Sequence, residues 1–169
     1  MPSSPIRAMI DVDRMEHTYL AKLFRSTFDK RAKTVQRQWA KEVKPKIKKM
    51  IIKRIQSGKS PVARMGEYAK YSRSYKRQIL KGRFKRFSKR ITPVNLRLSG
   101  KLLKSIRTVD SKNGFEVYFK SPIAKYHDED GAGKSRTIRR MLPGGGENFT
   151  RDISNMITQT LFRVLRRNL

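Results

Sequence analysis

The feature that most constrains this chain is a long, one-sided run of positive charge. Between residues 22 and 107 the sequence holds 29 Lys and Arg residues against 3 Asp and Glu residues, a net charge of +26. The flanking segments are close to balanced, at −1 over residues 1–21 and +4 over residues 108–169. Repulsion at this density opposes a compact state unless a polyanion or an acidic protein surface offsets it. A heavily solvated cationic face is the simpler alternative, although such faces normally mix both signs of charge.

The composition bounds the size and type of fold. The 169 residues suit one domain spanning residues 1–169, and a hydrophobic fraction of 37% allows only a modest core. There is no Cys, so a disulfide framework and a Cys-ligated zinc site are both excluded. No apolar run approaches the ~20 residues of a membrane span, and the N-terminus lacks an apolar signal segment. We therefore expect no membrane association and a protein that stays in the compartment where it is made.

Apolar residues recur every three or four positions through residues 13–57, which predicts a long basic amphipathic helix after an N-terminal arm at residues 1–12. Pro45 interrupts this pattern and predicts a kink or a restart of the helix. The aromatic members of the stripe favour core or subunit packing over base stacking, because the other members of the stripe are aliphatic. The residues assigned to subunit packing are Phe24, Phe28, Trp39 and, in the C-terminal helix, Leu161.

Residues 58–94 form a basic loop region in which Tyr and Phe alternate with Lys and Arg. Glycines and prolines punctuate it, and one helical turn is expected over residues 72–80. Cations that meet phosphates and rings that stack on bases would suit nucleic acid. The alternative is a loop that covers a neighbouring subunit, with packed rings and solvated cations. The predicted contacts to DNA or to an acidic partner are Lys81, Arg83, Lys85, Arg86, Lys89 and Arg90.

Residues 95–169 are expected to form an α+β core. Ser99 can cap a short helix, and residues 106–109 and 115–119 flank a turn that predicts a β-hairpin. A Gly-rich loop follows His127 and is expected to be mobile or shaped by a partner. The last helix should begin after a cap at Asn148 or Thr150. The predicted fold is therefore α+β, with a long N-terminal helix and a C-terminal helix packed on a small antiparallel sheet, joined by long loops.

Motifs for catalysis, cofactors and metals are missing from the sequence. The segments SGKS and AGKS resemble the end of a phosphate-binding loop, but Lys53 and Asp128 stand where the loop needs its first glycine. The acidic run after His127 lacks the ligand spacing of a calcium loop. With two His residues and no Cys, we expect no enzyme, no cofactor and no metal site.

The order of segments in the second half carries a family resemblance. LRLSGKLLKSIRTV is followed by a turn, then by GFEVYFKSPIAKYHDEDG, and then by RRMLPGGGENFTRDI before the last helix. This order is similar to that of the tail-completion and head–tail joining proteins of tailed bacteriophages. The family's Leu-x-x-(Thr/Ser)-Gly-x-Leu-x-x-Ser-Ile stretch is matched by Leu96, Ser99, Gly100, Leu102, Ser105 and Ile106, and its His-x-x-Gly-like segment is approximated by His127 and Gly131.

The resemblance implies a small structural subunit of the virion, assembled in the host cytoplasm. Copies of it would form a homo-oligomeric ring in the neck, between the portal or adaptor and the tail, around the channel for genomic DNA. Basic subunits in such a ring can hold DNA through its phosphates without recognising a sequence. The rival hypothesis is a cellular, sequence-nonspecific nucleic-acid-binding protein of the ribosome or nucleoid, for which the charge alone is sufficient evidence.

Overall fold

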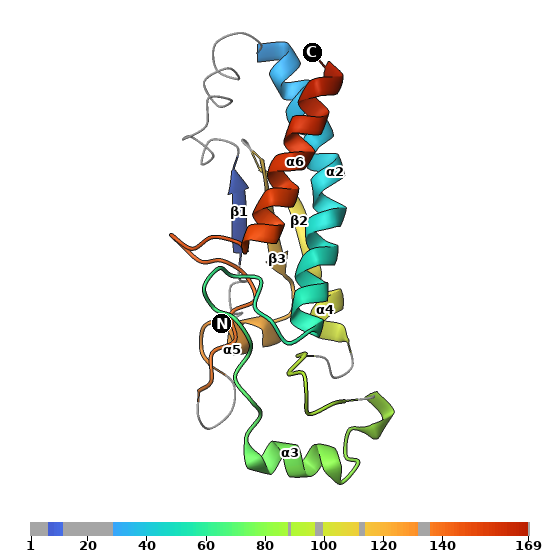
Figure 1. Ribbon diagram of the computed structural model, residues 1–169, viewed down its shortest axis with the longest axis vertical. Coiled ribbons are helices and arrows are strands. Elements are labelled where there is room, and N and C mark those ends of the chain that lie inside the picture. Colours follow the sequence, from blue (N-terminus) through green and yellow to red (C-terminus); the bar gives the residue numbers. More distant parts are fainter. Residues whose placement is uncertain are drawn as a thin grey trace.

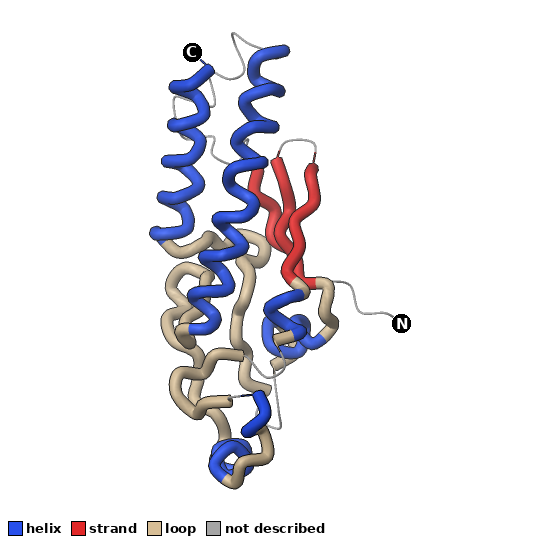
Figure 2. The backbone as a smooth tube through the Cα atoms, turned by 90° about the vertical axis from the view of Figure 1, so that its right-hand side faces the viewer, coloured by secondary structure: helices blue, strands red, loops and turns tan. Residues whose placement is uncertain are grey.

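Two long helices and a three-stranded antiparallel sheet make up the body of the molecule, and a loop-rich extension projects from one end (Figure 1). The computed structural model describes residues 7–11, 29–87, 89–96, 100–111, 114–131 and 136–168. Figure 2 shows helix α2 between helix α6 and the sheet. The predicted α+β class, with long helices on a small antiparallel sheet, is confirmed.

The sheet has the strand order β1-β3-β2, so the last strand in the chain is the central one. Strands β2 (Ile106–Ser111) and β3 (Gly114–Phe119) form the predicted hairpin. Strand β1 (Arg7–Asp11) pairs with the other edge of β3. These residues were expected to be an arm, and the prediction missed the strand because its five residues pair only with a segment about a hundred positions away.

Helix α2 spans Asp29–Gln56 and continues through Pro45, so of the two predicted outcomes, a kink or a restart, the restart is ruled out. Pro45 removes the donor to the carbonyl of Lys41, and both residues are exposed, where water can replace the lost bond. The predicted end of the helix near Gly58 is confirmed. The earlier part of the predicted helix, residues 13–28, lies outside the described residues.

Helix α6 spans Arg151–Asn168, and Thr150, one of the two predicted caps, immediately precedes it. It packs along α2, and three ion pairs join the two helices, one through Asp152 and two through Glu42. Arg54 contacts Asp152 at 3.1 Å, and Arg167 contacts Glu42 at 3.1 Å. Both pairs are partly exposed, so we expect each to contribute at most about 1 kcal/mol to stability.

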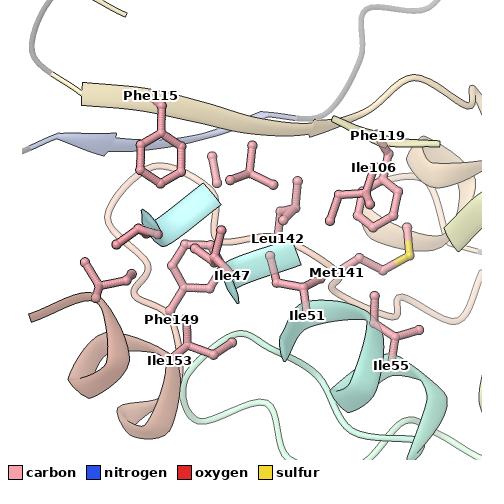
Figure 3. Close-up of a cluster of buried hydrophobic side chains, with 14 of the residues drawn as sticks. Ile47, Ile51, Ile55, Ile106, Phe115, Phe119, Met141, Leu142, Phe149 and Ile153 are labelled. Carbon is pink, nitrogen blue, oxygen red and sulfur yellow. The ribbon is translucent and has the colours of Figure 1, made fainter. Parts of the chain in front are cut away.

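The core lies where α2 meets the sheet and α6 (Figure 3). Every fourth residue of α2 from Val35 to Ile55 is buried, which puts one continuous apolar stripe against the sheet. The Trp39 ring lies 5.6 Å from that of Phe115, and its Nε1–H donates to the carbonyl of Ile157 at 3.3 Å. The fully buried large side chains are Trp39, Val43, Ile47, Ile51, Ile55, Val62, Phe115, Val117, Phe119, Met141, Leu142 and Ile153.

Four short helical segments complete the described structure: α3 (Arg73–Leu80), the 3-10 turn η2 (Lys85–Phe87), α4 (Lys101–Lys104) and α5 (Ile123–Asp128). The predicted turns at α3 and α4 are confirmed, whereas α5 was not predicted. Helix α4 follows Gly100 in a left-handed conformation, and the predicted cap, Ser99, lies outside the described residues.

The loop that follows α5 is held by this chain's own side chains over its described part, residues 136–148. The Asp128 carboxylate accepts hydrogen bonds from the backbone N–H groups of Met141 and Leu142, and it pairs with Arg140 at 3.1 Å. Arg140 also pairs with Glu147. A partner is therefore not needed to shape this part of the loop.

Candidate nucleic-acid interface

The densest positive charge lies in the extension at one end of the body. We define the basic lobe as residues 70–90, which contain α3 and η2 (Figure 1, bottom). The lobe follows the C-terminal end of α2, so it projects from the end of the molecule opposite to the C-terminus of α6. Figure 2 shows it beyond both the sheet and the long helices.

Ten Lys and Arg residues lie in the basic lobe, and from Tyr68 to Val109 the sequence has no Asp or Glu. Lys76 and Lys89 are half-buried, and the other eight cations are exposed. In the part of the chain that the structure describes, no carboxylate lies within ion-pair distance of any of the ten. The exposed members are Lys70, Arg73, Arg77, Lys81, Arg83, Lys85, Arg86 and Arg90.

Carboxylates of the body, in contrast, are mostly paired with cations of the body. Glu42 contacts three cations of α2 and α6, and Asp110 pairs with Lys44. Glu116 pairs with Arg7 at 3.0 Å. The carboxylates that form ion pairs in the described residues therefore do so with cations of the helices, the sheet and the loop after α5. None of them neutralises the charge of the basic lobe.

A small stack of rings gives the lobe its internal packing. Tyr71 and Tyr75 lie 5.0 Å apart, and Tyr75 and Phe84 lie 5.4 Å apart, between ring centroids. Helix α3 has no buried residue, and its N-terminus is capped by Ser72, which accepts from the N–H of Tyr75. Because these rings contact one another, the lobe offers cations for phosphates rather than free rings for bases.

Five of the six predicted contact residues are exposed on the basic lobe, and two of these also contact neighbouring side chains. Arg83 donates to Oε1 of Gln78 at 3.0 Å, and the Arg86 guanidinium lies 4.5 Å from the centroid of the Phe87 ring. These contacts hold the side chains against the lobe while their remaining donors face solvent. The exposed predicted residues are Lys81, Arg83, Lys85, Arg86 and Arg90.

Lys89, the sixth predicted residue, has a different environment. Its Nζ donates to Oδ1 of Asn95 at 3.3 Å and lies 4.8 Å from the centroid of the Tyr71 ring. Burial and the charge of Arg139 lower the pKa of Lys89 to about 8. Lys89 is therefore a constrained cation at the junction of the lobe and the body.

Sequence reasoning missed four cations of the lobe on or beside α3, three of them exposed. The prediction concentrated on the stretch between Gly82 and Pro93, where the cations are densest. The signal that could have found the others is the complete absence of acidic residues from position 68 to position 109. The missed residues are Lys70, Arg73, Lys76 and Arg77.

The residues assigned to subunit packing fall into two groups. Trp39 has no exposed surface and Leu161 is 4% exposed, and both lie in this chain's own core. For these two residues the core accounts for their burial without a second subunit. Phe24 and Phe28 lie outside the described residues.

Metal-binding groups and membrane-spanning helices are not found among the described residues. No group of three His, Asp or Glu residues among them could hold a metal ion. None of the helices within the described ranges has the length and apolar character to cross a bilayer. Comparison with known proteins finds no matching family model, no matching curated protein and no matching solved structure.

Proposed function

We propose that this chain is a structural subunit of the neck of a tailed bacteriophage, and that its basic lobe contacts DNA or an acidic surface of an adjoining ring. The observation that carries the proposal is a projecting segment with eight exposed cations and no acidic residue. Such a surface gains most of its binding free energy from phosphates and the release of their counterions. It contacts the backbone of DNA without selecting a sequence.

The segment order of the second half supports the neck assignment. The short helix α4, the hairpin of β2 and β3, the segment around His127 and the C-terminal helix follow one another as the resemblance to head–tail joining proteins leads us to expect. A lobe with little core of its own also suits a protein that works against a partner, because contacts made on assembly would complete its packing.

The test is assembly of particles with a charge-reversed lobe. Five exposed residues, Lys81, Arg83, Lys85, Arg86 and Arg90, are each changed to Glu in the phage that encodes the chain. DNA-filled heads joined to tails are then counted by electron microscopy. The expected result is a strong loss of joined particles with the folded chain still present, and normal numbers would overturn the proposal.

A matched control makes the same change in charge on the body. Lys33, Arg37, Lys41, Lys49 and Lys53 are exposed on α2, and five changes to Glu at these positions alter the net charge by the same amount. We expect this variant to assemble more normally than the lobe variant. Equal losses in both would show that net charge, and not the lobe, matters.

The rival function, a cellular nucleic-acid-binding protein, is favoured by the same exposed charge and makes a different prediction. It expects the isolated monomer to bind nucleic acid tightly and to form no ring. Native mass spectrometry of the purified chain, alone and with portal and tail proteins, separates the two hypotheses. A chain that stays monomeric and forms no complex with the portal and tail proteins would contradict the neck assignment.

A further inference from the structure

A cluster of basic side chains from three separate segments lies where the basic lobe joins the body. It consists of Lys89 at the end of the lobe and Arg139 in the loop after α5, which both lie near the ring of Tyr71, and of His127 on α5, which is close enough to feel both charges. We call these four residues the cationic cluster. The backbone N–H of Arg139 donates to the carbonyl of His127, which fixes the loop to α5.

Arg139 is the buried member of the cluster. It is 6% exposed, and its Cζ lies 5.7 Å from the centroid of the Tyr71 ring. One Nη donates to the carbonyl of Ala69 at 3.2 Å, whereas the Nε–H has no acceptor within the described ranges. Nor does any carboxylate of those ranges form an ion pair with it. A guanidinium carries five hydrogen-bond donors and remains charged, so Arg139 is a buried cation with unused donors.

Two further polar groups of the cluster are buried without a partner. Nδ1 of His127 has no hydrogen bond in the described part of the chain. The hydroxyl oxygen of Tyr71 lies near the backbone N–H groups of Asn95 and Leu96, and its own hydrogen finds no acceptor among the described residues. Buried polar groups in proteins are nearly always hydrogen-bonded, so the Arg139 Nε–H and the Tyr71 hydroxyl call for a missing acceptor. His127 can donate to the same acceptor in the tautomer that carries its proton on Nδ1.

Among the described residues, no carboxylate forms an ion pair with the charged groups of the cluster. Burial, Arg139 and Lys89 lower the pKa of His127 to about 4, and burial and Arg139 lower that of Lys89. Asp128, next to His127, is occupied by Arg140 and two backbone N–H groups. The undescribed gaps that lie nearest to the cluster in sequence, at 88, 97–99 and 132–135, contain no acidic residue either. A buried cation without a counter-charge is unfavourable, and an anion would relieve it.

We propose that the cationic cluster is a binding site for a phosphate group, held by Lys89 and Arg139 with hydrogen bonds from Tyr71 and His127. A phosphate presents several acceptor oxygens, and it suits a guanidinium together with an ammonium better than a monatomic ion does. Lys89 and His127 are only partly buried, so the group approaches past them. The site goes beyond the proposed function, because it can take a free phosphate whether or not the lobe contacts DNA.

The test is a titration of the full-length chain with sodium phosphate against sodium chloride at equal ionic strength. Nuclear magnetic resonance follows the Arg139 Nε–H and the His127 ring. Saturable shifts at both groups with phosphate, and a rise in the pKa of His127, are the expected result. Superimposable phosphate and chloride titrations would overturn the proposal.

Two variants locate the site. Lys89→Gln removes a part-exposed charge and should weaken phosphate binding by about tenfold or more, as expected for a charge-assisted hydrogen bond. Lys81→Gln removes an exposed charge of the lobe and should leave phosphate binding unchanged. Equal affinity in Lys89→Gln and the wild type would contradict the assignment, even if Arg139→Gln fails to fold.

A DNA duplex distinguishes the two sources of phosphate. If a backbone phosphate occupies the cluster, inorganic phosphate competes with the duplex, and Lys89→Gln lowers duplex affinity more than Lys81→Gln does. If the natural occupant is free phosphate, both effects are absent while the phosphate titration still saturates. Failure of the lobe to bind DNA would leave that titration unchanged, so the two proposals fail separately.

Discussion

The carboxylate of Asp128 organises the loop between α5 and α6, and its removal should destabilise the chain strongly. Asp128 is 3% exposed, and it accepts from the N–H groups of Met141 and Leu142, which are themselves fully buried. In Asp128→Ala both N–H groups lose their acceptor, at about 1–3 kcal/mol each. Arg140 keeps Glu147, which limits the further loss. We expect a total decrease in the free energy of unfolding of about 3–5 kcal/mol.

Urea unfolding at pH 7, followed by circular dichroism, measures this change. Asp128→Asn keeps one acceptor oxygen but turns an amide toward Arg140, so its loss should be smaller than that of Asp128→Ala. Asp130→Ala, at an exposed position two residues away, should stay within about 0.5 kcal/mol of the wild type. The reasoning is refuted if Asp128→Ala lowers the free energy of unfolding by less than about 1 kcal/mol, or by no more than Asp130→Ala.

Two further predictions concern the turn after α2 and the cationic cluster. Gly58 has φ +81°, and a Cβ added there would lie 2.7 Å from a proline side chain. Gly66 also has a positive φ, +61°, but a Cβ added there would meet nothing within 4 Å. Gly58→Ala should therefore lower the free energy of unfolding in urea by at least about 1 kcal/mol more than Gly66→Ala does. Equal losses would show that the close approach is unimportant. The pKa of His127 is about 4 in the folded chain, lowered by burial and the facing charges of Arg139 and Lys89, and about 6.5 when unfolded. The unfolded state therefore binds more protons, and up to about 3 kcal/mol of stability should be lost as the pH falls from 6.5 to 4. His127→Gln should flatten this dependence of the unfolding free energy on pH, and an unchanged slope would contradict it.

The parts of the fold that could be predicted are those set by local periodicity. The four-residue spacing from Val35 to Ile55 located α2, and the Asn113-Gly114 turn located the hairpin, because helices and tight hairpins use neighbouring residues. Strand β1 could not be found in this way, since its hydrogen bonds go to β3. The restart considered at Pro45 does not occur, since the helix continues through this exposed position.

The candidate site, too, could be predicted only where the signal is local in the sequence. The exposed cations of the lobe could be predicted from charge density, which does not depend on the fold. Lys89 was placed with them, but the fold brings it to Tyr71 and within reach of the charge of Arg139, about fifty residues away in sequence. Asp128 was considered as a metal ligand in the sequence. In the structure its carboxylate accepts hydrogen bonds from the backbone N–H groups of Met141 and Leu142, a role that no local sequence motif indicates.

The central claim is that the exposed cations of the basic lobe bind anionic partners, the phosphates of DNA among them, without sequence preference, and the salt dependence of duplex binding tests it most directly. Fluorescence anisotropy gives the association constant between about 50 and 200 mM salt. Five substitutions to Gln at Lys81, Arg83, Lys85, Arg86 and Arg90 should reduce the magnitude of the slope of its logarithm against the logarithm of salt concentration by about 4.5, which is about 0.9 for each lost contact. Five matched substitutions to Gln on α2, at Lys33, Arg37, Lys41, Lys49 and Lys53, should change the slope by less than about 1. An unchanged slope in the lobe variant, or an equal change in both, would contradict the account.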